Sequence, residues 1–225
     1  MIVSIHQPNF IPWLGYFYKI AQSDIFVLLD DVQFSKNSFI NRNRIKTPQG
    51  EMWLTLPVKQ SGNFGQKINE CEIQQKELSV KKVLNSIKLN YVKAPYFQQY
   101  IQQIENILNS NTDSLEDINC KLIFFACESL EIGTKIIKSS TLNIRGKEST
   151  ERLIEICKNV NAKTYLSGKG GLNYQEEDLF TQHNIQLKIS QFSPPNYNQM
   201  WGNFIGGLSI IDILLNCGPD TKKFI

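Results

Sequence analysis

The sequence has 225 residues, of which 41% are hydrophobic and 20% charged, and its formal net charge at pH 7 is +3. This composition is typical of a globular protein with a substantial core, and so small a charge argues against nucleic acid as a partner. No stretch of about 18 apolar residues predicts a membrane-spanning helix, and the first residues lack the pattern of a secretory signal. We therefore expect a cytoplasmic protein without membrane insertion.

The five cysteines are scattered along the chain and form no Cys-x-x-Cys pair. Neither a disulfide framework nor a structural metal site is expected from such spacing, and we assign no residue as a dedicated metal ligand. We expect most of the cysteines to be buried as small hydrophobic residues.

The first third of the chain predicts a strand-helix-strand unit. Residues 1–6 and 24–34 are apolar runs, and residues 14–23 between them have helical spacing. Two buried strands joined by a helix are typical of a parallel sheet. Residues 38–45 and 51–58 then predict a hairpin around the turn at 47–50, and residues 67–74 another short strand.

The middle of the chain, about 75–131, is helical in two or three pieces that break at 94–95 and near 109–113. Strand and helix patterns then alternate: strands at 135–144, 163–168 and 185–192, and helices at 151–160, 175–183 and 208–217. We predict an α/β fold with a mainly parallel, Rossmann-like sheet flanked by helices. Both ends of the chain build the sheet, residues 1–225 form a single domain, and a helical insert occupies the middle.

The segment 4–20, SIHQPNFIPWLGYFYKI, contains the first candidate site. Ligands of open α/β sheets bind beyond the carboxyl ends of the strands, where His6 and Gln7 would lie. Trp13 would line the same loop, and Gly15 would let the backbone approach a ligand. The alternative is that His6 is a hydrogen-bonded buried histidine and Trp13 a core residue.

Asp30 and Asp31 follow the second strand. Adjacent side chains on a strand point to opposite faces, so we expect only one of the two carboxylates to face the cleft. It would act as a base or hold a magnesium ion, or it would simply cap the next loop.

Basic residues follow in the segment 34–46, interleaved with asparagines: Lys36, Asn41, Arg42, Asn43, Arg44 and Lys46. On a strand, Arg42, Arg44 and Lys46 share one face. Guanidinium groups bind phosphate and amides bind sugar hydroxyls, although charges also protect a solvated strand edge.

Two further segments are candidates for ligand binding. Ser167 and Gly168 begin a glycine-rich loop that either cradles an anion or forms a plain turn. Trp201 and Asn203 lie in an irregular segment whose composition suits stacking on a base or sugar. No pattern of an activated serine or cysteine nucleophile is present.

Taken together, the stretches HQPNFIPWLGYFYKI, DIFVLLDDVQFSKNSFINRNRIKTPQG, WLTLPV, YLSGKGG and MWGNFIGGLSIIDILLNCGP resemble the WbqC-like family. This resemblance covers nearly the whole chain. It implies a bacterial transferase of surface-polysaccharide biosynthesis that adds an acyl or aminoacyl group, such as glycine, to an amino-sugar nucleotide or a related precursor.

A fainter similarity is to the HxGH nucleotidyltransferase superfamily. The stretch at residues 13–16, WLGY, stands at the place of the HxGH turn, although both of its histidines are absent, and SSTLNIR is similar to a late signature of that superfamily. ATP with magnesium therefore stays open as a cofactor.

The leading hypothesis is a transferase that holds a nucleotide sugar. Arg42, Arg44 and Lys46 would bind phosphate, Trp201 and Asn203 would contact base or sugar, and His6 would take the proton from the attacking amine. Asp30 or Asp31 would orient His6 or hold a metal. The alternatives are a non-catalytic sugar-nucleotide-binding accessory protein, an ATP-dependent amide-forming ligase, and an interaction scaffold; a homo-oligomer is compatible with each.

Overall fold

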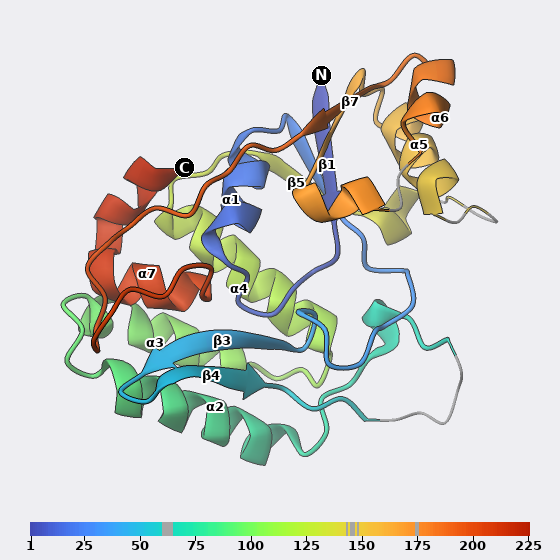
Figure 1. Ribbon diagram of the computed structural model, residues 1–225. Helices are drawn as coiled ribbons and strands as arrows, with labels where there is room; N and C mark the ends of the chain where they lie inside the picture. Colours follow the sequence, from blue (N-terminus) through green and yellow to red (C-terminus); the bar gives the residue numbers. More distant parts are fainter. Residues whose placement is uncertain (60–64, 143, 145–146, 148, 174–175) are drawn as a thin grey trace.

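The computed structural model describes residues 1–59, 65–142, 144, 147, 149–173 and 176–225 (Figure 1). Its centre is a five-stranded sheet in the order β5-β2-β1-β6-β7, and every neighbouring pair of strands is parallel. The strands are β1 (Ile2–His6), β2 (Ile25–Leu28), β5 (Lys135–Lys138), β6 (Thr164–Ser167) and β7 (Gln186–Ile189). The predicted Rossmann-like sheet, built from both ends of the chain, is confirmed.

The predicted first unit is also confirmed, because helix α1 (Leu14–Ala21) joins the neighbouring strands β1 and β2. Phe17 and Ile20 are fully buried on the side of α1 that faces the protein. Burying one such side chain contributes roughly 1.5–3 kcal/mol, which explains why a helix of eight residues is stable here.

The two faces of the sheet are covered by different helices. Val3, Ile5 and Val27 pack in one core with residues of α5 (Ser149–Asn159) and α6 (Glu177–Gln182). Phe26 and Leu28 belong to the larger core on the opposite face, which contains residues of α1 and of α4 (Leu115–Ser129) and α7 (Ile210–Cys217). Alternation of side chains along each strand supplies both cores.

The predicted hairpin is present as β3 (Arg42–Thr47) and β4 (Gly50–Thr55), which pair antiparallel outside the main sheet. The predicted helical insert consists of α2 (Lys76–Tyr91), α3 (Phe97–Leu108) and α4. Its helices share the larger core with the hairpin and with α1 and α7. The insert is therefore part of the same packed body as one face of the sheet.

Two predicted strand regions differ in the structure. Residues 67–74 contain a 3-10 helix (Ile68–Glu70), because the Glu70 carboxylate accepts a hydrogen bond from the Lys67 backbone at 3.0 Å. The predicted strand 135–144 ends at Lys138, and a 3-10 helix (Ser139–Leu142) follows. Two further 3-10 helices are Lys169–Asn173 and Gly218–Phe224.

The predicted burial of most cysteines is confirmed for Cys71, Cys120, Cys127 and Cys157, whereas Cys217 is half-buried. Burial raises the pKa of Cys127 and Cys157 to about 12, so both are protonated at neutral pH. Across the described residues, no helix combines the length and apolar character needed to cross a membrane.

Candidate functional site

The strand order in the sheet reverses at β1. The chain places β2 and β5 on one side of β1, and then β6 and β7 on the other. Ligands of open parallel sheets bind beyond the carboxyl ends of the strands at such a switch point. His6 ends β1 and Ser167 ends β6, so both lie at this edge. Figure 1 shows the loop after β1 running from the edge toward the hairpin, where the Phe10 backbone donates to Phe39 O at 2.9 Å.

His6 is half-buried, and its ring packs edge-on against Tyr16 with 4.9 Å between ring centroids. Its Nδ1 lies 3.1 Å from the backbone oxygen of Gln7, to which the Tyr16 hydroxyl also donates. A proton on Nδ1 leaves the lone pair on Nε2, and the described residues offer Nε2 no hydrogen-bond partner. Burial and the charge of Lys19 lower the pKa of His6 to about 3, so the imidazole is neutral at physiological pH.

Lys19 is a buried cation beside His6 that the sequence pattern alone does not single out. Lys19 lies on α1 and is only 4% exposed. Its Nζ donates a hydrogen bond to the backbone oxygen of Ile5 at 3.2 Å. No carboxylate among the described residues pairs with it. Burial lowers the pKa of Lys19 to about 7. The one available signal was its spacing: Lys19 follows Tyr16 by three positions, on the helical face that meets β1.

Asp30 and Asp31 are held by the protein's own donors. Asp30 is buried and accepts hydrogen bonds from the Ser140 backbone at 2.9 Å and the Ser140 hydroxyl at 2.6 Å. Asp31 pairs with Arg152 on α5 at 2.6 Å and accepts from the Ser139 hydroxyl at 2.5 Å. Burial alone would raise the pKa of Asp31, but the Ser139 and Arg152 contacts lower it below its usual range. The two carboxylates lock the loop after β2 to the residues that follow β5, and a catalytic role for either stays a prediction.

Ser167 and Gly168 lie at the carboxyl end of β6, beside β1. Ser167 is buried, its hydroxyl is 3.2 Å from the Gly168 oxygen, and its backbone oxygen accepts from Ser190 at 2.8 Å. A methyl group added to Gly168 would meet nothing within 4 Å. The two residues stand at the switch point, and their role as an anion cradle stays a prediction.

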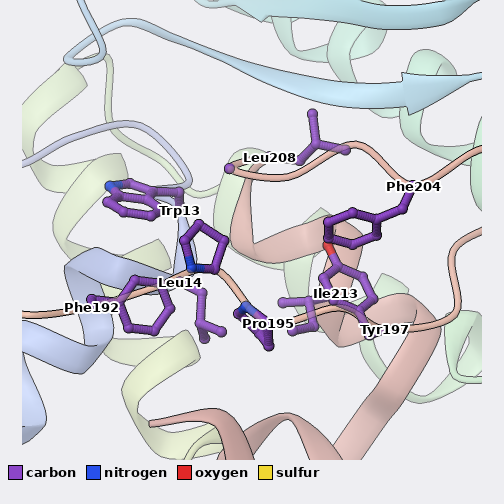
Figure 2. Close-up of a pocket in the computed structure, with 10 residues that line it drawn as sticks. Trp13, Leu14, Phe192, Pro195, Tyr197, Phe204, Leu208 and Ile213 are labelled. Atoms are coloured by element: carbon purple, nitrogen blue, oxygen red, sulfur yellow. The ribbon is translucent and has the colours of Figure 1, made fainter.

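Trp13 and Gly15 form a packing pair at the start of α1. A methyl group on Gly15 would lie 2.4 Å from the Trp13 ring, so the glycine makes room for the indole. Trp13 packs against Phe192 with 5.4 Å between ring centroids. Figure 2 shows both rings beside a small pocket that Pro195 and Tyr197 also line. These contacts explain Gly15 by packing; ligand contact by Trp13 stays a prediction.

The two asparagines of the hairpin bond mainly to the backbone. Asn43 donates to the backbone oxygen of Ile11 at 2.8 Å and accepts from the Arg44 backbone at 2.8 Å. Asn41 donates to the Leu56 oxygen at 3.1 Å, and its own Oδ1 is buried without a hydrogen-bond partner among the described residues. The amides thereby fix the loop after β1 and the end of β4 to the strand β3.

The predicted common face of Arg42, Arg44 and Lys46 follows from the hairpin register, in which Arg44 stands opposite Trp53 and Lys46 opposite Glu51. The Arg42 guanidinium stacks over the Trp53 ring at 4.3 Å, and Arg44 pairs with Glu51 at 2.5 Å. Lys36 is exposed in the loop before this strand.

Lys46, at the far end of that face, is only 2% exposed. Its Nζ donates to Gln199 Oε1 at 2.9 Å and to the backbone oxygen of Asn203 at 2.5 Å. Trp201, which lies between these two residues, donates its indole N–H to the Asn90 oxygen on α2 at 2.9 Å. Lys46 and Trp201 therefore hold the C-terminal segment against the hairpin and α2. Asn203 contributes its backbone to this contact, and its side chain is at an exposed position.

Comparison with known proteins identifies the family. The model of the WbqC-like protein family matches residues 7–224. The chain belongs to the WbqC-like protein family. This WbqC-like chain is also similar to a Mycobacterium tuberculosis (strain ATCC 25618 / H37Rv) protein described as "Uncharacterized protein Rv1507c", with 34% identity over 225 residues that cover 99% of this chain and 96% of the relative.

The structure of this WbqC-like protein brings some of the predicted residues together and separates others. The Leu29 backbone donates to His6 O at 2.8 Å, so the aspartates that follow Leu29 neighbour His6 along the sheet edge. Trp201 lies against α2 instead. Among the described residues, no group of three or more His, Cys, Asp or Glu side chains could hold a metal ion.

Proposed function

We propose that this WbqC-like protein transfers an acyl or aminoacyl group to the amine of an amino-sugar nucleotide or a related precursor. The observation that supports this best is His6, a neutral imidazole at the switch point of a parallel sheet, whose Nε2 has no hydrogen-bond partner in the described part of the chain. The resemblance to the WbqC-like family supplies the class of reaction.

In the proposed step, the amine nitrogen attacks the carbonyl carbon of an activated acyl donor. The nitrogen–carbon bond forms, the bond from the carbonyl carbon to the leaving group breaks, and the proton leaves the nitrogen for His6 Nε2 before it reaches the leaving group. The hydrogen bond of Nδ1 to Gln7 O holds the ring in the tautomer that this step needs. The charge of Lys19 lowers the pKa of His6, so the ring does not carry a second proton before the reaction.

One set of observations favours a second candidate, a non-catalytic sugar-nucleotide-binding protein. Burial makes His6 a weak base, and both Asp30 and Asp31 are already bonded to serine or arginine side chains. Such an edge would hold a ligand without turning it over.

The test incubates the purified full chain with a panel of amino-sugar nucleotides, amino acids and ATP with magnesium, and records intact masses. The proposal expects a new acylated sugar from the wild type and a loss of about 100-fold or more in His6→Gln, the usual scale for a general base. His183→Gln is the matched control, because His183 is exposed at the end of α6.

Unfolding midpoints of both variants establish that the comparison is between folded proteins. Equal turnover by the wild type and His6→Gln would overturn the assignment of the base. Retained ligand with every mass unchanged would favour the binding protein.

A further inference from the structure

The outer face of the hairpin carries a patch that the proposed step does not use. We call Phe39, Arg42, Arg44 and Trp53 the stacked patch. The rings of Phe39 and Trp53 have centroids 5.9 Å apart, and the guanidinium groups of Arg42 and Arg44 lie 4.3 and 5.7 Å from the Trp53 ring. Two aromatic rings and two cations thus share one surface.

Arg42 is the unusual member of the stacked patch. Among the described residues no carboxylate and no hydrogen-bond acceptor contacts its guanidinium, and its buried Nε has no hydrogen-bond partner either. Arg44, by contrast, is paired with Glu51. An arginine stacked over an indole is restricted in position by that contact, while its outer N–H groups stay available to an anion.

The aromatic side chains of the stacked patch are open to solvent. Phe39 is 46% exposed and Trp53 is 44% exposed. The basic face continues to Lys46, but the C-terminal segment covers that end. The open part of the face is therefore the part that holds the rings and Arg42.

This open part adjoins the candidate site. Phe39 accepts a backbone hydrogen bond from Phe10, four residues after His6. The stacked patch is therefore a neighbour of the loop that leaves β1.

We propose that the stacked patch binds a nucleoside diphosphate, with the base against the Phe39 and Trp53 rings and a phosphate on Arg42. The patch suits a ligand that contains both a planar ring and an anion. Planar rings stack on aromatic side chains, and guanidinium groups bind phosphate through two parallel hydrogen bonds. This inference rests on the proposed function, which supplies the sugar that the diphosphate would carry. The new part is that the hairpin binds the nucleotide end of that substrate.

The experiment measures the binding of uridine diphosphate and of inorganic pyrophosphate to the full chain by isothermal titration calorimetry. Arg42→Gln is expected to weaken both ligands about 10-fold or more. Trp53→Leu removes the ring that would stack on the base, and it is expected to weaken the nucleotide by a similar factor and pyrophosphate less. The controls are Lys82→Gln, which removes an exposed cation on α2, and Phe124→Leu, which removes an aromatic ring on α4 that is 47% exposed; both should bind like the wild type.

Three results would overturn the inference: no binding of either probe to the wild type, equal binding by the wild type and both patch variants, or loss of a dimer in Trp53→Leu with nucleotide binding unchanged. The last result, measured by light scattering, would make the patch an interface between copies of the chain. Because binding needs no turnover, the predicted pattern without any acylated product would reject the transferase and leave this inference standing.

Discussion

Replacement of Lys19 by Met tests the central electrostatic feature of the candidate site. Lys19 is buried, its Nζ donates to the backbone oxygen of Ile5, and burial lowers its pKa from 10.5 to about 7. The folded chain therefore releases the Lys19 proton at a lower pH than the unfolded chain. Between about pH 7 and 10.5 the unfolded chain holds the Lys19 proton and the folded chain releases it, so the contribution of Lys19 to the free energy of unfolding rises with pH across this window.

The magnitude follows from the same two pKa values. The interval from about 7 to 10.5, at about 1.4 kcal/mol per pH unit, corresponds to a cost of about 5 kcal/mol below the window. Met has a similar length and no charge, so Lys19→Met removes this cost and loses a hydrogen bond of about 1 kcal/mol. We expect the variant to be about 3–4 kcal/mol more stable than the wild type at pH 7, where Lys19 is already partly deprotonated, and the gain to disappear by about pH 10.5.

The assay is urea unfolding of both proteins at several pH values from 6.5 to 10.5, with the exposed Lys82→Met as control. The difference between wild type and Lys19→Met isolates Lys19, because the buried tyrosines and cysteines that also titrate at high pH are common to both proteins. A difference that stays constant with pH would refute the reasoning, since it would show that Lys19 keeps its ordinary pKa in the fold.

Two further changes test the packing and the ion pair around the site. Gly15→Ala should destabilise the protein by about 1–3 kcal/mol in thermal unfolding, because the new methyl group collides with the Trp13 ring, whereas Gly133→Ala enters open space and should have little effect. Arg152→Met should lower the unfolding midpoint more at pH 7 than at pH 3, because Arg152 helps to hold the Asp31 pKa below 3.8, and the stability from such a group is lost as the pH falls through the folded pKa. An equal loss at both pH values would exclude that role for the Asp31 pair.

The parts of the fold that the sequence predicts are those set by local pattern. The unit β1-α1-β2 follows from two apolar runs and one helical stretch, and the hairpin from alternation on both sides of a turn. The failures at 67–74 and 139–142 have a different origin; residue 143 of the predicted strand 135–144 lies outside the described residues. Local propensity favours a strand there, but Glu70 caps a turn in the first segment, and Asp30 bonds Ser140, 110 positions away, in the second. A local side-chain cap therefore overrides the strand propensity in the first segment, and a tertiary contact overrides it in the second.

In the candidate site, too, the sequence predicts what depends on local pattern and does not predict long-range contacts. Position in the chain places His6 and Ser167 at the sheet edge, because strand ends can be read from pattern. Their partners cannot be read in this way: the Arg152 that pairs with Asp31 is 121 positions away, and the Trp53 under Arg42 becomes its neighbour only through the hairpin register. Sequence reasoning therefore finds the edge and leaves the electrostatics to the structure.

On the basic face of β3, the distant C-terminal segment covers Lys46 and leaves Arg42 uncovered. Alternation places Arg42 and Lys46 on the same face, but Gln199 accepts from Lys46 and in turn donates to Asp212 at 3.0 Å. Tyr197 also donates to Asp212, at 2.7 Å. This buried network anchors the C-terminal segment over one end of the face, so the Lys46 ammonium serves the fold. Arg42 lies beyond the covered end and has no hydrogen-bond acceptor among the described residues, so the proposed phosphate site lies on the open half of the face.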